Sequence, residues 1–356
     1  MINERSLFNM MRFKIFLKFI LPFVIILTIG SFGGERTQAI GQDSSPFSGP
    51  VYVLLYHPWE VGFGPAFSDH LNWLKQNGYQ TISPETLIDY LEGKPASIPS
   101  RPILLTFDDG TIENFNIVYP ALQEFGYTGV SFVITSTDFT FYSQKVWWRE
   151  VDRSGILKIE SHSHSHGLIW IGPQIIDFFS GEEDDYYLIK GRDSRLGAPI
   201  YEFDYELISH RYLPDKRIAD LCVRYVAQNG GADFFKKANW ENELSQVVED
   251  FRNRFQERNS YEKEVQKKLR FQTELYQSKK IIERTIGRGK QVKCFAYPWG
   301  AYDIDLIDQL KRYGYRGAFT TDSGGNFPGD DPFKIKRVII TSEMTVEDLA
   351  NILKTE

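Results

Sequence analysis

The sequence feature that most restricts the fold is a helix-to-strand junction that occurs three times. In "NGYQTI", "FGYTGVSF" and "YGYRGAF", a helical pattern ends at Gly-Tyr and an apolar strand pattern follows at once. Gly78, Gly126 and Gly314 can adopt the left-handed conformation that closes a helix. Repeated alternation of strands and helices predicts a parallel sheet, either as a barrel or doubly wound. In both arrangements, functional side chains lie at the carboxyl ends of the strands.

One part of the chain breaks this alternation. Residues 168 to about 270 look irregular and then helical, and they include the acidic segment "GEEDDYY". "ELSQVVEDFRNRF" has apolar residues at helical spacing, and a second helix is expected from about Ser260 to Thr285. We interpret this stretch as a long helical insertion. It is either a lid that rims the substrate cleft or a decorative subdomain.

The first 40 residues differ in composition from the rest. Four basic residues and one acid are followed by Phe19–Gly33, an uncharged apolar run of 15 residues. A membrane-spanning helix needs about 20 residues, so the pattern predicts an export signal at residues 1–40. An uncleaved anchor that attaches the protein to a membrane is the alternative. Residues 41–50 are expected to be a linker and residues 51–356 the main domain.

Two adjacent carboxylates follow a buried strand. In "RPILLTFDDG", the apolar run ends at Asp108 and Asp109. Charged side chains at the end of a buried strand are costly unless a partner or a metal ion compensates them. We therefore expect these two acids to belong to a functional site.

A second charged cluster follows another strand. Half of the six histidines of the chain lie within "ESHSHSHG", which comes after the strand pattern "ILKI". His162 and His166 are four residues apart, so one helical turn would place them on one face, where they could share a metal ion. His164 would then point elsewhere. With a carboxylate, two imidazoles form an open metal site that leaves room for water.

Together, "LTFDDG" and "SHSHSH" resemble the motifs of the polysaccharide deacetylases, the NodB-homology domain of carbohydrate esterase family 4. The resemblance runs from about Val51 to the C-terminus apart from the insertion, and "VLLYH", "FVITS", "SKKIIERTIG" and "FAYPWGAYD" are similar to further family landmarks. It implies an irregular (β/α) barrel of about seven parallel strands. By motif position, it implies a catalytic base at Asp108, metal ligands at Asp109, His162 and His166, and a loop-supporting hydrogen bond from Ser163. The backbone N–H of Trp299 would stabilise the oxyanion.

The sequence departs from the commoner family pattern in two places. Ala296 of "FAYPWG" occupies the position of an arginine that orients the base, and we expect either that Arg337 replaces it or that Arg337 lies on the surface. The usual C-terminal histidine, which acts as general acid, is missing, because no histidine follows His210. His57, after the first strand, is the expected acid, with a structural histidine as the alternative; His164 and His210 are the other candidates for the acid.

These features lead to one main functional hypothesis and two alternatives. The main one is an exported hydrolase that removes N-acetyl groups from an N-acetylglucosamine-containing cell-wall or exopolysaccharide, using one divalent metal ion, expected to be zinc. An O-deacetylase of an acetylated xylan-like polymer and a non-catalytic glycan-binding envelope protein are the alternatives. The net charge of −6 gives no indication of a nucleic-acid partner, and no G-x-S-x-G elbow supports an unrelated α/β hydrolase.

Overall fold

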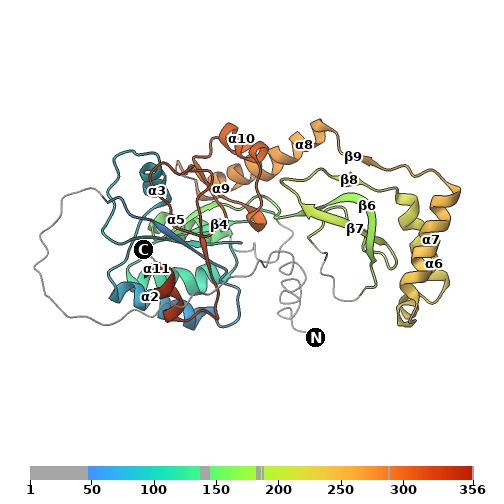
Figure 1. The fold of residues 1–356 in the computed structure, drawn as a ribbon, viewed down its shortest axis with the longest axis horizontal. Helices are drawn as coiled ribbons and strands as arrows, with labels where there is room; N and C mark the ends of the chain where they lie inside the picture. Colours follow the sequence, from blue (N-terminus) through green and yellow to red (C-terminus); the bar gives the residue numbers. More distant parts are fainter. Residues whose placement is uncertain (1–46, 137–144, 182–185, 187, 288, 355–356) are drawn as a thin grey trace, which may run out of the picture. The chain divides into compact units, whose positions relative to one another are not determined.

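The computed structural model describes residues 47–354, except 137–144, 182–185, 187 and 288. The predicted export signal and most of the predicted linker lie outside the described residues. Within the described part of the chain, no helix combines the length and the hydropathy that a membrane crossing requires. The helices and strands follow one another along the chain as shown in Figure 1.

The first half of the chain contains β1 (Tyr52–Tyr56), α2 (Phe63–Gln76), β2 (Gln80–Thr81), α3 (Pro84–Leu91), β3 (Pro102–Phe107), the π-helix η1 (Asn114–Val118), α4 (Tyr119–Phe125), β4 (Gly129–Val133), α5 (Lys145–Ser154), β5 (Leu157–Ser161) and β6 (Leu168–Phe178). The second half contains β7 (Pro199–Tyr205), β8 (Tyr212–Leu213), α6 (Lys216–Gln228), η3 (Gly231–Lys236), α7 (Trp240–Arg254), β9 (Ser260–Tyr261), α8 (Glu264–Phe271), the π-helix η4 (Gln272–Gln277), α9 (Ser278–Ile286), β10 (Cys294–Ala296), η5 (Pro298–Gly300), α10 (Ile304–Arg312), β11 (Gly317–Phe319), β12 (Val338–Ile340) and α11 (Val346–Lys354).

The main sheet is parallel, as the repeated junctions predict. Its strand order is β11-β10-β5-β4-β3-β1-β12, and the short β2 pairs with β3. The seven strands along this path form a half-barrel surrounded by helices, which confirms the predicted (β/α) barrel. Gly78, Gly126 and Gly314 all have positive φ angles of 74–75° at the predicted junctions.

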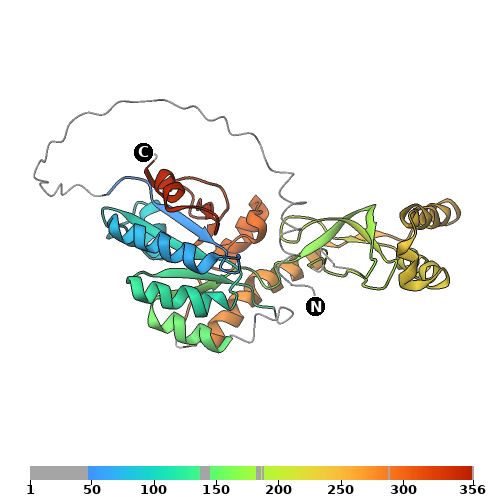
Figure 2. The same ribbon diagram turned by 90° about the horizontal axis from the view of Figure 1, so that it is seen from below.

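The sheet curves around an apolar interior. Val53, Leu104, Phe132 and Phe319, from four different strands, belong to one buried cluster. The rings of Phe132 in β4 and Phe319 in β11 have centroids 5.0 Å apart, although β5 and β10 lie between these strands in the sheet. The alternate residues of the strands, such as Leu105, face a second core under the helices. Helix α2 packs against α4 and α11, and α5 packs against α9 (Figure 2).

The chain divides into two compact units. The main unit contains the parallel sheet, and the other contains Pro173–Glu202 and Pro214–Asn259. In the smaller unit, α6, η3 and α7 enclose a buried cluster that includes Cys222, Phe234 and Leu244. The boundaries of the insertion at 168–270 stay a prediction.

The stretch after the histidines is more regular than its sequence suggests. Leu168–Phe178 forms the 11-residue strand β6, which pairs with β7. The irregular structure expected from residue 168 onward is therefore wrong for these residues. The two expected helices are present: α7 covers the first, and α8, η4 and α9 run from Glu264 to Ile286, before Gly287. The expected start of the second at about Ser260 is wrong, because Ser260–Tyr261 forms the strand β9.

Candidate active site

The adjacent carboxylates occupy a sharp turn at the carboxyl end of β3. Every residue of β3 is buried, and the Asp108 N–H donates to the carbonyl of Tyr56 at the end of β1. Asp109 and Gly110 both have left-handed backbone conformations, with φ of 70° and 69°. A Cβ atom on Gly110 would lie 2.6 Å from Cγ1 of Val133, so a glycine is required here.

Arg337 holds Asp108 in its ionised form. The guanidinium donates from Nη1 and Nη2 to the two oxygens of Asp108 at 2.7 and 2.8 Å, and from Nε to the carbonyl of Thr320 at 2.7 Å. Arg337 is fully buried, which excludes the surface position considered above. Burial by itself would raise the pKa of Asp108, but the charge and the hydrogen bonds of Arg337 oppose it, and the pKa is lowered to about 2. Asp108 is therefore a carboxylate with a fixed orientation at neutral pH.

The two histidines reach Asp109 from a loop rather than a helix. Residues 162–167 contain no helical turn, and Ser163 and His166 have φ of 69° and 52°. The expected helical turn is therefore wrong, because these left-handed residues redirect the chain. Ser163 Oγ accepts a hydrogen bond from the His166 N–H at 3.0 Å, as expected for a residue that supports the loop.

Asp109, His162 and His166 bring one oxygen and two nitrogen donors together. Their ligand atoms all lie within 4.8 Å of one another, with Asp109 Oδ1 at 3.6 Å from His162 Nε2 and 3.9 Å from His166 Nε2. Donors around one tetrahedral zinc ion lie about 3.4 Å apart when each bond is about 2.1 Å. The donor set and its spacing therefore fit a divalent ion.

Neighbouring groups orient these three donors. His162 Nδ1 donates to the Ala296 carbonyl at 2.9 Å, which leaves Nε2 as the acceptor nitrogen that faces Asp109. Trp59 Nε1 donates to Asp109 Oδ2 at 2.8 Å. Burial lowers the pKa of His166 to about 4, so this imidazole is neutral at pH 7, the form that binds metals.

The remaining candidates lie at different distances from this centre. His57, half-buried, is close enough to influence the charge of Asp108, and its Nδ1 is buried without a hydrogen-bond partner among the described residues. The Trp299 ring lies 4.6 Å from the His166 ring, and the Trp299 backbone is left-handed with φ of 62°. His164 Nδ1 contacts Thr135 Oγ1 at 3.0 Å, and His210 is exposed beside Glu264. The last two therefore do not join the cluster.

Three further residues at the site were not predicted from the sequence. Trp59 lies three residues after the carboxyl end of β1, and this position at a strand end is a signal from which it could have been predicted. Tyr205, at the end of β7, stacks on Trp299 with ring centroids 5.9 Å apart. Glu274, in η4, binds the histidine loop. Nothing in the sequence marks Tyr205 or Glu274.

Comparison with known proteins agrees with this geometry. Residues 96–175 match the family model of polysaccharide deacetylases. Over this segment, the chain is similar to the polysaccharide deacetylases. The segment contains Asp108, Asp109, His162 and His166, whereas His57, Trp299 and Arg337 lie outside the matched residues.

Two curated deacetylases are similar over part of the chain. YxkH of Bacillus subtilis, whose name assigns it to the polysaccharide deacetylases, is 32% identical over 122 residues, which cover 32% of this chain and 42% of YxkH. Poly-β-1,6-N-acetyl-D-glucosamine N-deacetylase of Escherichia coli (strain K12) is also 32% identical over 122 residues, which cover 28% of this chain and 17% of that enzyme. The chain thus spans less than half the length of these relatives.

Solved deacetylase structures share the fold over most of the chain. The BpsB deacetylase domain from Bordetella bronchiseptica aligns with a TM-score of 0.56 and 21% identity, covering 83% of this chain and 98% of that domain. A de-N-acetylase from Aggregatibacter actinomycetemcomitans aligns with a TM-score of 0.56 and 20% identity, covering 85% of this chain and all of that one. These alignments extend the deacetylase fold beyond the segment that matches the family model.

Proposed function

We propose that this protein is an exported, metal-dependent hydrolase that removes N-acetyl groups from an N-acetylglucosamine-containing polysaccharide. The observation that carries the proposal is the pairing of a buried, ionised carboxylate with a metal-binding cluster. Asp108 is fixed by Arg337, and its Oδ2 lies 3.8 Å from Nε2 of His162, a member of that cluster. A proton acceptor beside a cation site is the arrangement that metal-assisted hydrolysis of an amide uses.

Asp108 would act as the general base. Water must lose a proton as its oxygen bonds to the acetyl carbon, and a carboxylate beside the cation site can accept that proton. The two hydrogen bonds from Arg337 restrict the carboxylate to one orientation. Arg337 would thus take the role of the family's orienting arginine, because Ala296 occupies the usual position of that arginine.

Asp109, His162 and His166 would hold the divalent ion, with zinc as the expected metal. When bound, such an ion polarises the acetyl carbonyl and makes water more acidic. The chain itself supplies the three donors and orients Asp109 through Trp59 and His162 through the Ala296 carbonyl.

His57 and Trp299 would complete the reaction. The C–N bond breaks only if the departing nitrogen receives a proton, and the products are acetate and a free amine. His57 directly follows β1 and contributes to the lowered pKa of Asp108, so it is our candidate for the donor. The Trp299 backbone N–H would stabilise the oxyanion, and the adjacent rings of Trp299 and Tyr205 provide aromatic surface for a sugar.

The choice of an amide substrate is supported by the E. coli relative, which is named as a poly-β-1,6-N-acetyl-D-glucosamine N-deacetylase. Because such polymers are assembled for the cell envelope or its exterior, the proposed substrate also agrees with the predicted export signal. Membrane attachment would follow if that signal is retained as an anchor.

Acetate release by the purified full-length protein tests the proposal. The substrates would be β-1,6-linked poly-N-acetylglucosamine, β-1,4-linked N-acetylglucosamine oligomers and acetylated xylan, each supplied with zinc or cobalt. We expect release from at least one amide polymer, with new free amines in equal amount. Release from acetylated xylan alone would contradict N-deacetylation, and binding without release from any polymer would support the glycan-binding alternative.

A further inference from the structure

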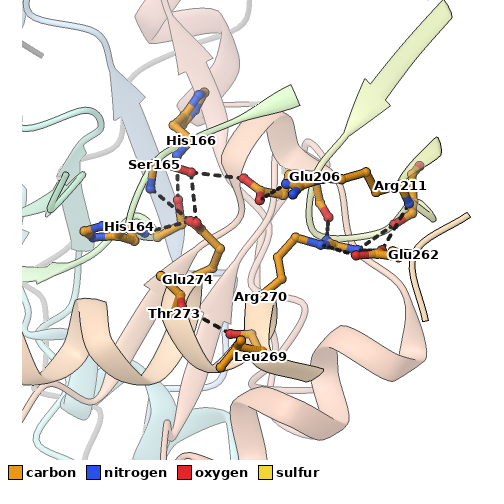
Figure 3. Close-up of polar contacts among 12 residues, drawn as sticks. His164, Ser165, His166, Glu206, Arg211, Glu262, Leu269, Arg270, Thr273 and Glu274 are labelled. Carbon is orange, nitrogen blue, oxygen red and sulfur yellow. Dashed lines mark hydrogen bonds and ion pairs between the residues drawn. The ribbon is translucent and has the colours of Figure 1, made fainter. Parts of the chain in front are cut away.

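A buried carboxylate holds the loop between the two histidines. Glu274 is 1% exposed and lies in the π-helical turn η4, between α8 and α9 (Figure 3). Its Oε2 accepts hydrogen bonds from the backbone N–H groups of His164 and Ser165 at 3.1 and 2.9 Å. Its Oε1 accepts from the Ser165 hydroxyl at 3.0 Å. Thus Glu274 contacts two of the three residues that separate His162 from His166.

The same helix face holds the rest of the loop. Ser278 lies four residues after Glu274, and its hydroxyl donates to the Ser163 carbonyl at 2.9 Å. It also contacts the Ser161 hydroxyl at 2.9 Å. Short π-helical turns often occur at functional positions, because they change which residues a helix presents. Here the turn presents the acceptor Glu274 to Ser165, and Ser278, the first residue of α9, presents its hydroxyl to Ser163.

A second buried carboxylate, Glu206, contacts the same loop residue as Glu274. The Ser165 hydroxyl also lies 3.0 Å from Oε2 of Glu206, which is 2% exposed. Arg211 pairs with Glu206 at 3.2 Å, and Arg270 binds the Glu206 carbonyl and Glu262. Figure 3 shows the Ser165 hydroxyl in contact with both glutamates, so its one hydrogen can bind either carboxylate.

We propose that Glu274 is a positioning residue for the metal site: it fixes the left-handed loop so that His162 and His166 face Asp109. The proposal rests on the metal site described under Proposed function. Ser163 and His166 have strained left-handed backbones, with φ of 69° and 52°, which persist only when surrounding contacts determine them. Loss of groups that orient metal ligands typically weakens metal binding by about 10–100-fold.

The experiment measures cobalt(II) binding to the full-length, metal-free chain by its visible absorption. Glu274→Ala should lose affinity by about 10–100-fold. Glu274→Gln should stay near wild type, because one amide oxygen can still accept both N–H groups while Ser165 donates to Glu206. Glu274→Asp, one methylene shorter, cannot reach both amides in the same way, so its cobalt affinity should lie between those of the other two variants. It replaces Glu274→Ala in the test if the alanine variant does not fold.

Asp152→Ala is the matched structural control. Asp152 also accepts a backbone N–H, from Ile159 at 2.9 Å, and pairs with Lys290 at 2.7 Å, but it contacts β5 rather than the loop. We expect it to lower stability and leave cobalt affinity unchanged. Excess metal should restore the activity of Glu274→Ala with KM unchanged, which a general folding defect would not allow.

Amide hydrogen exchange at His164 and Ser165 provides a readout that needs no metal. In the metal-free chain, both amides should lose protection in Glu274→Ala and keep it in Glu274→Gln. Folded Glu274→Ala or Glu274→Asp with wild-type cobalt affinity would overturn the positioning role while the proposed function stands. Failure of the wild-type chain to bind cobalt would instead remove the proposed metal site, and this proposal with it.

Discussion

Replacing Arg337 by Met tests the link between the buried ion pair and the base. Methionine is similar in length and apolar, so it can fill much of the same space without the charge. Asp108 would remain buried, but its main compensating partner would be gone. We expect its pKa to rise above the ordinary value of 3.8, because burial then acts with less opposition.

The size of the effect follows from the structure. In the metal-free protein, the pKa of Asp108 is lowered from 3.8 to about 2, which corresponds to about 2 kcal/mol of stability. This contribution is complete above pH 3.8 and is lost as the pH falls through about 2. Breaking a buried pair by removing one partner costs about 3–5 kcal/mol. The free energy of unfolding should therefore fall by about this larger amount at pH 7.

The assay is denaturant unfolding of the metal-free protein between pH 7 and pH 3. The difference in the free energy of unfolding between wild type and Arg337→Met should shrink on acidification. In the variant, the raised pKa lets Asp108 become protonated, so its buried charge disappears. Arg337→Lys, which keeps the charge but not the two-bond geometry, should lie between them. Arg316→Met is the control: Arg316 is about one-third exposed beside Asp89, so its loss should cost less than about 1 kcal/mol.

A free energy of unfolding equal to wild type at pH 7 would refute this reasoning. So would a difference that stays constant down to pH 3, because the loss would then come from packing rather than from the charge on Asp108. Activity provides a second check, since Arg337→Met should lower kcat on an amide substrate even when metal is saturating.

Three further outcomes are expected. His166→Ala should lose bound metal, measured as metal per chain, and wild-type occupancy would exclude His166 as a ligand. His57→Ala should lower kcat on amide substrates by about 10²–10⁴, the usual range for a lost general acid, and should affect an activated ester far less; equal losses would mean that His57 only shapes the site. Gly110→Ala should lower the free energy of unfolding by about 2–4 kcal/mol, from a left-handed backbone and a clash with Val133; unchanged stability would show that the turn adapts.

Local sequence patterns were sufficient where the determining interactions are local. The Gly-Tyr junctions indicated the parallel sheet. Because Asp108 and the histidines follow strands of this sheet, they were expected at its carboxyl edge. By contrast, "LIWIGPQIIDF" contains Gly172 and Pro173, which usually interrupt regular structure, yet pairing with β7 makes it a strand. Spacing alone suggested a helical turn for the histidines, because it cannot reveal left-handed residues that distant groups stabilise.

Long-range contacts account for the residues that the sequence did not reveal. From the sequence, Arg337 could either orient Asp108 or lie on the surface. Nothing nearby in the sequence decides between these alternatives, because Arg337 and Asp108 are 229 positions apart. Glu274 lies 109 positions from Ser165 and has no motif of its own, so only the folded chain shows that it binds the histidine loop.

Acetate release from β-1,6-linked poly-N-acetylglucosamine, with and without metal, tests the central claim most directly. The wild-type chain should release acetate only when a divalent ion is present, and a chelator followed by zinc should abolish and then restore release. Asp108→Asn should keep about one ion per chain and lose about 10²–10⁴ in rate. Equal rates for the metal-free and zinc-loaded wild type, or a normal rate for Asp108→Asn, would contradict the account.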